Sequence, residues 1–213
     1  MTRRGNSYAR PDSRTRAAKA RGYPARSVFK LEEIDAKWRL FKPGQRVLDL
    51  GAAPGSWSIY AADKVGKAGR VVAVDLQPIP NALGDNVVVV RADVLAVREP
   101  ESASSNTPSG EPTDPVLVHA PYDVVMSDMA PSTSGSKVSD QARSFELFMK
   151  ALDVAMHVGK SGSSFVGKIF MSGDFPKAKE AVAAHFETCR ALKPAGTRSE
   201  SSEIYLVGFQ LHR

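Results

Sequence analysis

The chain has 213 residues, of which 42% are hydrophobic and 24% are charged. This length is too short for two full enzyme domains, and this composition excludes a mainly disordered, collagenous or membrane-embedded protein. The single cysteine, Cys189, excludes an internal disulfide and a CxxC zinc site, and the four histidines show no HxxxH spacing. We therefore expect one soluble domain in a reducing compartment, without a metal.

The excess positive charge lies in the first 26 residues. This segment has eight basic side chains and one acid, whereas the rest of the chain has 21 basic and 22 acidic residues. It has almost no bulky aliphatic side chains, which predicts a disordered arm, and its composition suits RNA phosphates. The predicted RNA contacts are Arg3, Arg4, Arg10, Arg14, Arg16, Lys19, Arg21 and Arg26. A solvated tail is the alternative; a mitochondrial transit peptide is disfavoured, because only Tyr8 and Tyr23 could form an apolar face.

Residues 27–213 alternate between helical and strand patterns, as in a single α/β domain. Ser27 can cap a helix through Lys37, which Lys42-Pro43-Gly44 follows. The expected strands are 46–50, 70–74, 87–90, 122–126 and 164–169, and the expected helices are 56–66, 137–158 and 175–185. This alternation predicts a parallel sheet with helices on both faces. Two last strands, 188–192 and 203–211, predict an antiparallel hairpin at one edge.

One internal segment has the composition of a surface loop. Residues 99–115 contain four prolines and four serines and show no hydrophobic periodicity. Such a segment predicts a flexible loop, to which we assign no role in chemistry.

A glycine-containing turn follows the first strand. In Asp49-Leu50-Gly51-Ala52-Ala53-Pro54-Gly55, a strand runs directly into a turn and then into a helix, as in nucleotide-binding folds. Gly51 and Gly55 do not have the GxGxxG spacing, so NAD is disfavoured. The turn alone would fit either a ligand site or a plain tight turn.

Carboxylates at the ends of the next strands favour the ligand site. Asp75 can accept hydrogen bonds from ribose hydroxyls, and Asp93 can meet an adenine amino group. In an open α/β sheet, ligands bind at the carboxyl ends of adjacent strands, where these acids are expected. Each acid alone would be an ordinary strand-ending residue.

The same rim carries two further polar residues. Asp128 ends the fourth strand, and Lys168 interrupts an otherwise apolar fifth strand. A lysine there is costly unless it is paired or faces a cleft; the alternative is a side chain that reaches solvent at the strand end. Considered individually, Lys30 and Glu203 would be interpreted as solvated surface residues.

Five separated motifs together resemble one family. They are Arg26-Ser27-Val28-Phe29-Lys30-Leu31, the Asp-Leu-Gly-Ala-Ala-Pro-Gly turn, Ser127-Asp128-Met129-Ala130-Pro131 with Ser134-Gly135, Gly167-Lys168, and Ser202-Glu203-Ile204-Tyr205. In this order, over about residues 20–211, they resemble the FtsJ/RlmE family of S-adenosylmethionine-dependent ribosomal RNA 2′-O-methyltransferases. Ser56 departs from the family pattern, in which a second glycine is common after Gly55.

The resemblance implies a Rossmann-like, seven-stranded methyltransferase fold and two sets of site residues. The implied catalytic tetrad is Lys30, Asp128, Lys168 and Glu203. The implied cofactor contacts are Gly51, Gly55, Trp57, Asp75, Asp93 and Asp128. The implied substrate is large-subunit ribosomal RNA, at a uridine of the peptidyl-transferase region, within the assembled subunit.

The chemistry assigns a role to each member of the tetrad. A ribose 2′-hydroxyl must lose its proton as it attacks the methyl group, and Lys168 is the candidate proton acceptor. Asp128 would orient Lys168, while Lys30 and Glu203 would hold the ribose. We expect a cytoplasmic monomer with no membrane partner. The alternatives are a 2′-O-methyltransferase of transfer RNA or messenger RNA caps, and a non-catalytic RNA-binding assembly factor.

Overall fold

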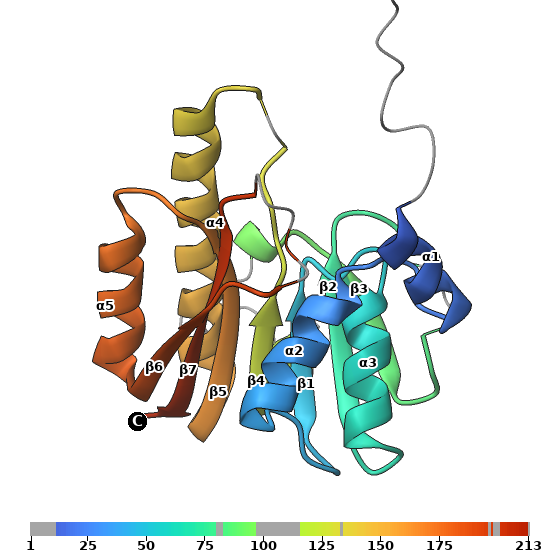
Figure 1. The fold of residues 1–213 in the computed structure, drawn as a ribbon. Helices are drawn as coiled ribbons and strands as arrows, with labels where there is room; N and C mark the ends of the chain where they lie inside the picture. The colour runs from blue at the N-terminus through green and yellow to red at the C-terminus, as the bar shows by residue number, and fades with distance from the viewer. Residues whose placement is uncertain are drawn as a thin grey trace, which may run out of the picture.

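A seven-stranded sheet forms the centre of the protein (Figure 1). The structure is a computed structural model, and it describes residues 12–79, 83–96, 116–132, 134–195, 197 and 201–212. The strands are β1 (Arg46–Leu50), β2 (Arg70–Asp75), β3 (Val87–Arg91), β4 (Tyr122–Ser127), β5 (Gly159–Phe170), β6 (Phe186–Leu192) and β7 (Glu203–Leu211). Their order across the sheet is β3-β2-β1-β4-β5-β7-β6.

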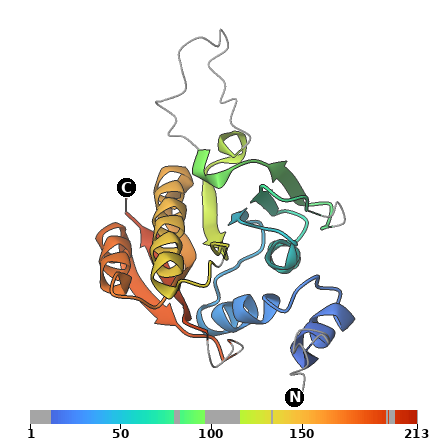
Figure 2. The same ribbon diagram turned by 90° about the horizontal axis from the view of Figure 1, so that it is seen from above.

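Helices cover both faces of this sheet (Figure 2). They are α1 (Ser13–Ala20), α2 (Val28–Trp38), α3 (Ser56–Val65), α4 (Lys137–Val158) and α5 (Phe175–His185), with short 3₁₀ turns η1 (Val94–Ala96) and η3 (Leu117–His119). One hydrophobic core joins the sheet to α4 and α5, and a second joins it to α1, α2 and α3. Within the described ranges, no helix is long and apolar enough to cross a bilayer.

The central strands are apolar along nearly their whole length because both of their faces are covered. Four of the five residues of β1, and four of the six of β2, are buried. β1 pairs in parallel with β2 and β4, and β4 pairs in parallel with β5, which aligns the carboxyl ends of these strands. β7 is antiparallel to both of its neighbours, β5 and β6.

The predicted α/β fold class and edge hairpin are confirmed. β1 and β7 have the expected bounds, whereas β5 begins five residues before the expected start at residue 164. Ser27 precedes α2 without a side-chain cap; instead its carbonyl accepts a hydrogen bond from Trp57 Nε1, 3.0 Å away. The predicted 99–115 loop lies outside the described residues, so its role stays a prediction.

The expectation that residues 1–26 form a wholly disordered arm is wrong for residues 12–26. Asp12 caps α1 by accepting a hydrogen bond from the Thr15 backbone N–H at 2.7 Å. Ala18 on this helix is fully buried in the core shared with α2 and α3. An isolated helix of eight residues would be marginal in water, so docking on the domain stabilises it.

Two further contacts attach this segment to the domain. Arg21 forms a salt bridge with Glu32 of α2, and the Ala25 backbone N–H donates to Ser56 Oγ at 2.7 Å. Ser56 is thus a docking point for the chain before α2. Residues 1–11 lie outside the described part of the chain.

Candidate active site

A cavity of about 490 Å³ lies at the carboxyl ends of β1, β2 and β4. This is the edge where open parallel sheets bind their ligands. It is lined by residues of the first turn, by the ends of β2 and β3, and by the segment after β4. The lining includes Gly51, Pro54, Asp75, Asp93, Asp128 and Met129. Four of the six predicted cofactor contacts therefore lie around one cavity, and their contact with a cofactor stays a prediction.

Gly51 allows the segments after β1 and β4 to approach closely. Its φ of +76° is in the left-handed region, and a Cβ atom there would lie 2.3 Å from Met129 Cγ. Any other residue would be strained and would displace the Met129 side chain. Glycine therefore keeps the backbone of the turn open to the cavity.

Asp75 organises the floor of the cavity. Its Oδ2 accepts a hydrogen bond from the Ala53 backbone N–H at 2.9 Å, and its Oδ1 accepts one from Gln77 at 2.8 Å. One carboxylate thus joins the turn after β1 to the turn after β2, and each oxygen has a further lone pair for a ligand hydroxyl. Asp93 is held by the Leu95 backbone N–H, which donates to Asp93 Oδ1 at 2.9 Å.

Two predicted cofactor contacts do not line this cavity. Gly55, with a φ of +103°, is the N-cap residue that precedes α3, and a Cβ atom there would lie 2.5 Å from Leu83 Cδ2. Trp57 is buried, and its ring centroid is 5.7 Å from that of Tyr205. The structure therefore gives both residues packing roles, and their direct contact with a cofactor stays a prediction.

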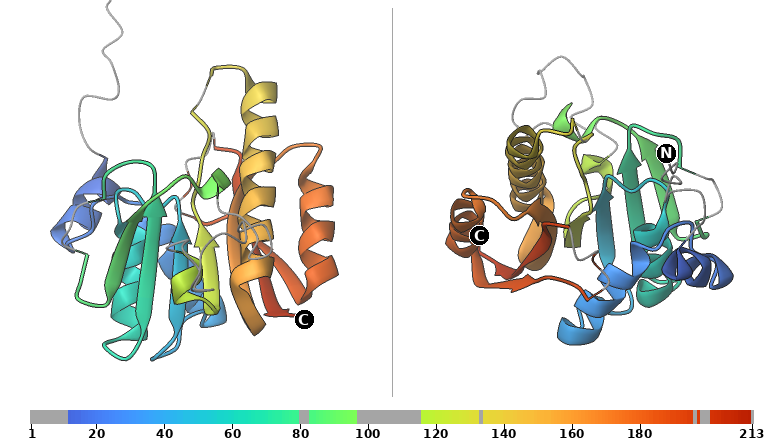
Figure 3. Two further views of the ribbon diagram at one scale, coloured as in Figure 1. Left: turned by 180° about the vertical axis from the view of Figure 1, so that it is seen from behind. Right: turned by 45° about the horizontal axis from the view of Figure 1, so that its top comes forward.

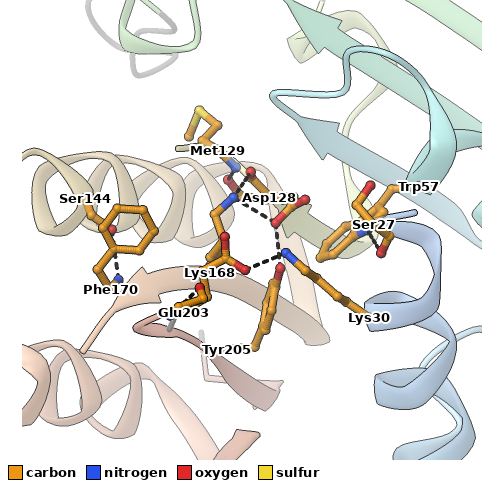
Figure 4. Close-up of polar contacts among 12 residues, drawn as sticks. Ser27, Lys30, Trp57, Asp128, Met129, Ser144, Lys168, Phe170, Glu203 and Tyr205 are labelled. Atoms are coloured by element: carbon orange, nitrogen blue, oxygen red, sulfur yellow. Dashed lines mark hydrogen bonds and ion pairs between the residues drawn. The ribbon is translucent and has the colours of Figure 1, made fainter. Parts of the chain in front are cut away.

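The four residues of the predicted tetrad come together beside the cavity (Figure 4). Lys30 Nζ of α2 lies 2.6 Å from Glu203 Oε2 of β7, although 173 residues separate them in sequence. Lys168 Nζ of β5 lies 2.9 Å from Asp128 Oδ1 and also donates to the Asp128 carbonyl. The Lys168 and Asp128 side chains are 5% and 18% exposed, so this ion pair is largely shielded from water.

The charges around Asp128 keep its carboxyl ionised. Burial by itself raises the pKa of Asp128, but the positive charges of Lys168 and Lys30 lower it. Hydrogen bonds from Tyr205 and Lys168 lower it further, and the net result is a pKa below the usual value. Asp128 is therefore a carboxylate that accepts hydrogen bonds and orients the Lys168 amine.

The sequence analysis did not identify the role of Tyr205. Its hydroxyl donates to Asp128 Oδ1 at 2.6 Å, and its ring lies 5.8 Å below Lys30 Nζ. Burial and the Asp128 charge raise the pKa of Tyr205, which keeps the hydroxyl protonated as a donor. Tyr205 pairs directly with Lys168 across β5 and β7, a register that the sequence alone does not show.

A second buried carboxyl belongs to Asp49, the penultimate residue of β1. It is 1% exposed, and Ser58 Oγ donates to its Oδ2 at 2.6 Å, while its Oδ1 has no hydrogen-bond partner within the described residues. Burial raises the pKa of Asp49 to about 7; the Ser58 hydrogen bond opposes this, and the charges of Asp128 and Asp75 add to it. The signal for burial was present in the sequence, since Leu48 and Leu50 flank it in a central strand.

The predicted RNA contacts fall into three groups. Arg3, Arg4 and Arg10 lie outside the described residues. Arg21 and Arg26 form salt bridges with Glu32 and Asp12. Arg14, Arg16 and Lys19 are exposed on α1, which Figure 3 shows beside the domain. Nothing in the described part of the chain groups three His, Cys, Asp or Glu side chains as a metal site would, and the expectation of a metal-free enzyme stays a prediction.

Comparisons with known proteins agree with this geometry. The family model described as FtsJ-like methyltransferase matches residues 23–211. A Sorangium cellulosum protein named ribosomal RNA large subunit methyltransferase E is 56% identical over 96% of this chain and 90% of its own length. A protein of the same name from Syntrophobacter fumaroxidans is 43% identical over 97% and 99%.

Solved structures share the fold. A putative ribosomal RNA methyltransferase from Plasmodium falciparum superposes with a TM-score of 0.72 at 22% identity, over 89% of this chain and 98% of its own. Fibrillarin from Aeropyrum pernix, solved with natively bound S-adenosyl-L-methionine, gives a TM-score of 0.54 at 15% identity, over 78% of this chain and 67% of its own. At these identities, the likeness concerns the fold alone.

Proposed function

Because this chain belongs to the FtsJ-like methyltransferase family, we propose that it transfers a methyl group from S-adenosylmethionine to a ribose 2′-hydroxyl of large-subunit ribosomal RNA. The observation that carries this proposal is the pair of lysine–carboxylate contacts, Lys30–Glu203 and Lys168–Asp128, beside the cavity. The names of the curated relatives support the substrate class. The finer proposal, a uridine of the peptidyl-transferase region within the assembled subunit, rests on the motif resemblance.

The residues around the cavity fit S-adenosylmethionine. Asp75 would accept hydrogen bonds from the ribose hydroxyls, and Asp93 would meet the adenine amino group. Gly51 leaves the backbone accessible to the cofactor, and the Asp128 carboxylate complements a positively charged centre. When bound, S-adenosylmethionine supplies an electrophilic methyl group on a sulfonium.

The tetrad performs the remaining tasks. Lys30 and Glu203 can hold the ribose through one donor and one acceptor that are already paired with each other. Lys168 accepts the 2′-hydroxyl proton as a neutral amine, so the ammonium group that pairs with Asp128 must first release its own proton to solvent. Asp128, which Tyr205 fixes by a hydrogen bond, orients the Lys168 amine toward the hydroxyl. Such positioning of groups before the reaction supplies much of the rate acceleration.

The direct test measures methyl incorporation from radiolabelled S-adenosylmethionine into purified large ribosomal subunits, free ribosomal RNA, transfer RNA and capped messenger RNA. We expect incorporation into the large subunit, at a 2′-oxygen found by mapping alkali-resistant linkages. Incorporation only into transfer RNA or caps would contradict the substrate class. Cofactor binding without incorporation into any RNA would favour a non-catalytic assembly factor.

Replacing Asp75 with alanine should weaken S-adenosylmethionine binding by about 1 to 3 kcal/mol, because the ribose hydroxyls lose a charged acceptor. The turns joined by Asp75 through Ala53 and Gln77 also lose their common acceptor. Saturating cofactor should restore much of the rate. Isothermal titration calorimetry measures the affinity.

The control is Asp63→Ala, which removes an exposed carboxylate from α3. It should leave cofactor affinity unchanged. If the dissociation constant for S-adenosylmethionine is unchanged in the Asp75→Ala protein, Asp75 only joins the two turns and does not bind the cofactor.

Removing the charges of the N-terminal segment should weaken RNA binding through fewer phosphate contacts. Each lost contact should reduce the slope of log affinity against log salt by about 0.7 to 0.9. Arg14→Gln/Lys19→Gln removes two exposed charges of α1 and leaves the Arg21–Glu32 and Arg26–Asp12 salt bridges intact. Deletion of residues 1–11 removes three more basic residues.

The measurement is the affinity for large-subunit RNA across a salt series. Cofactor affinity should not change in either protein, because α1 does not line the cofactor cavity. Slopes equal to that of the unmodified protein would show that the segment is only a solvated surface.

A further inference from the structure

A second cavity lies at the opposite end of the sheet from the active site. It has a volume of about 470 Å³ and is lined by residues that include Gly44, Arg46, Lys67, Gly69, Arg70 and His119. Arg46 and Arg70 are the first residues of β1 and β2, whereas the cofactor cavity lies where these strands end. In Figure 1 the amino ends of β1 and β2 are at the bottom, next to the turns after α2 and α3.

Two arginines lie side by side at this cavity, on neighbouring strands of the sheet. Arg46 and Arg70 are register partners in the parallel pair of β1 and β2, and both are exposed. Neighbouring strands are about 4.8 Å apart, so the two side chains leave the same face of the sheet close together. Like charges directly opposite each other destabilise a sheet unless an anion lies between them.

No acid neutralises this cluster. Within the described residues, the side chains of Arg46, Arg70 and Lys67 form no salt bridge with a carboxylate. Asp123 is the acid next to Arg46, but it accepts from the Arg46 backbone N–H and pairs with Lys160. The cavity therefore combines three positive side chains without a counter-ion from the protein.

His119 also lines this cavity, and the positive charges of the two arginines act on its side chain. Burial lowers its pKa, and the positive charges of Arg70 and Arg46 lower it further. A neutral imidazole can donate one hydrogen bond to an anion, and a bound anion would restore the charged form.

We propose that this cavity binds a phosphate group. The guanidinium groups of Arg46 and Arg70 match phosphate oxygens in geometry, and Lys67 adds a third charge. Gly44 and Gly69 are also lining residues, and they bring no side chain into the cavity. The phosphate comes either from the backbone of an RNA segment remote from the methylated ribose or from a free phosphate compound.

The first measurement uses inorganic pyrophosphate as the probe and the double variant Arg46→Gln/Arg70→Gln. Pyrophosphate should bind the unmodified protein, and the variant should lose at least about tenfold in affinity, as expected for lost hydrogen bonds between charged groups. The matched control, Lys179→Gln/Arg190→Gln, removes the same charge from exposed positions on α5 and β6 and should bind normally. Normal S-adenosylmethionine binding by the variant shows that it is folded.

An NMR titration of the histidine rings gives an independent readout. Bound pyrophosphate should raise the pKa of His119 and leave the rings of His185 and His212 unaffected, since neither lines the cavity. His119→Asn identifies the signal. A solvated surface without a binding site would give no such selective shift.

The salt dependence of binding to large-subunit RNA tests whether the phosphate in the cavity belongs to RNA. This measurement rests on the proposed function. If RNA phosphates occupy the cavity, the double variant should have a slope smaller by about 0.7 to 0.9 per lost contact, and the control should not. Pyrophosphate binding with an unchanged slope assigns the site to a free phosphate compound. If pyrophosphate does not bind and the slope of the double variant is also unchanged, the proposal is wrong, whatever the methylation assay shows.

Discussion

Replacing Lys168 with alanine should lower the rate of methyl transfer by at least about 100-fold, the usual cost of losing a general base. Lys168 is the proton acceptor in the proposed reaction, and its amine is held by Asp128 at 2.9 Å. It does not line the cofactor cavity, so S-adenosylmethionine affinity should stay nearly unchanged. Single-turnover rates with saturating cofactor measure the first quantity, and calorimetry measures the second.

The matched control is Lys160→Ala. Lys160 lies on the same strand, β5, and also pairs with an aspartate, but it is at the other end of the strand and exposed. Its loss should leave the rate near that of the unmodified protein. Near-normal turnover in the Lys168→Ala protein would exclude Lys168 as the base.

The strands could be predicted because a parallel sheet covered on both faces requires apolar runs of strand length. β1 and β7 were predicted with their observed bounds. The pairing of Lys30 with Glu203 could not be derived from local pattern, because it requires β7 to lie beside β5 and α2 to reach the same edge. Only the family resemblance, which rests on the motifs and their order, indicated that these four residues form one site.

Helix α1 was not predicted from the sequence, because its segment is rich in charge and lacks bulky apolar residues. The segment Ser13–Ala20 buries only one alanine, so it shows no hydrophobic periodicity. Its signals were local: Asp12 at the cap, several alanines, and Gly22, with a φ of +84°, after the last turn. Trp57, which the resemblance assigns to the cofactor site, packs against Tyr205, and its contact with a cofactor stays a prediction.

The buried Asp49 makes the stability of the fold depend on pH. In the folded protein burial raises the pKa of Asp49 to about 7, whereas in the unfolded chain an aspartate titrates near 3.9. A folded-state pKa above the unfolded one contributes stability that is fully present below about pH 4 and is lost as the pH rises through about 7. At about 1.36 kcal/mol for each pKa unit, this contribution amounts to about 4 kcal/mol.

Asp49→Asn should remove this dependence, because the amide does not titrate and resembles the protonated carboxyl. Its oxygen can still accept the hydrogen bond that Ser58 Oγ donates. As the pH rises from 4 to 8, we therefore expect the free energy of unfolding of the variant to increase by about 4 kcal/mol relative to that of the unmodified protein. Urea unfolding followed by circular dichroism at unit steps of pH measures the difference.

The comparison protein is Asp63→Asn, which changes an exposed aspartate of the neighbouring helix α3. The difference in the free energy of unfolding between this variant and the unmodified protein should be nearly constant over the same pH range. Other titrating groups, such as His119 and Asp128, are present in all three proteins, so their contributions largely cancel. Parallel stability curves for the unmodified and Asp49→Asn proteins would mean that Asp49 is ionised in the fold. The unpartnered Oδ1 would then require a donor other than those of the described residues.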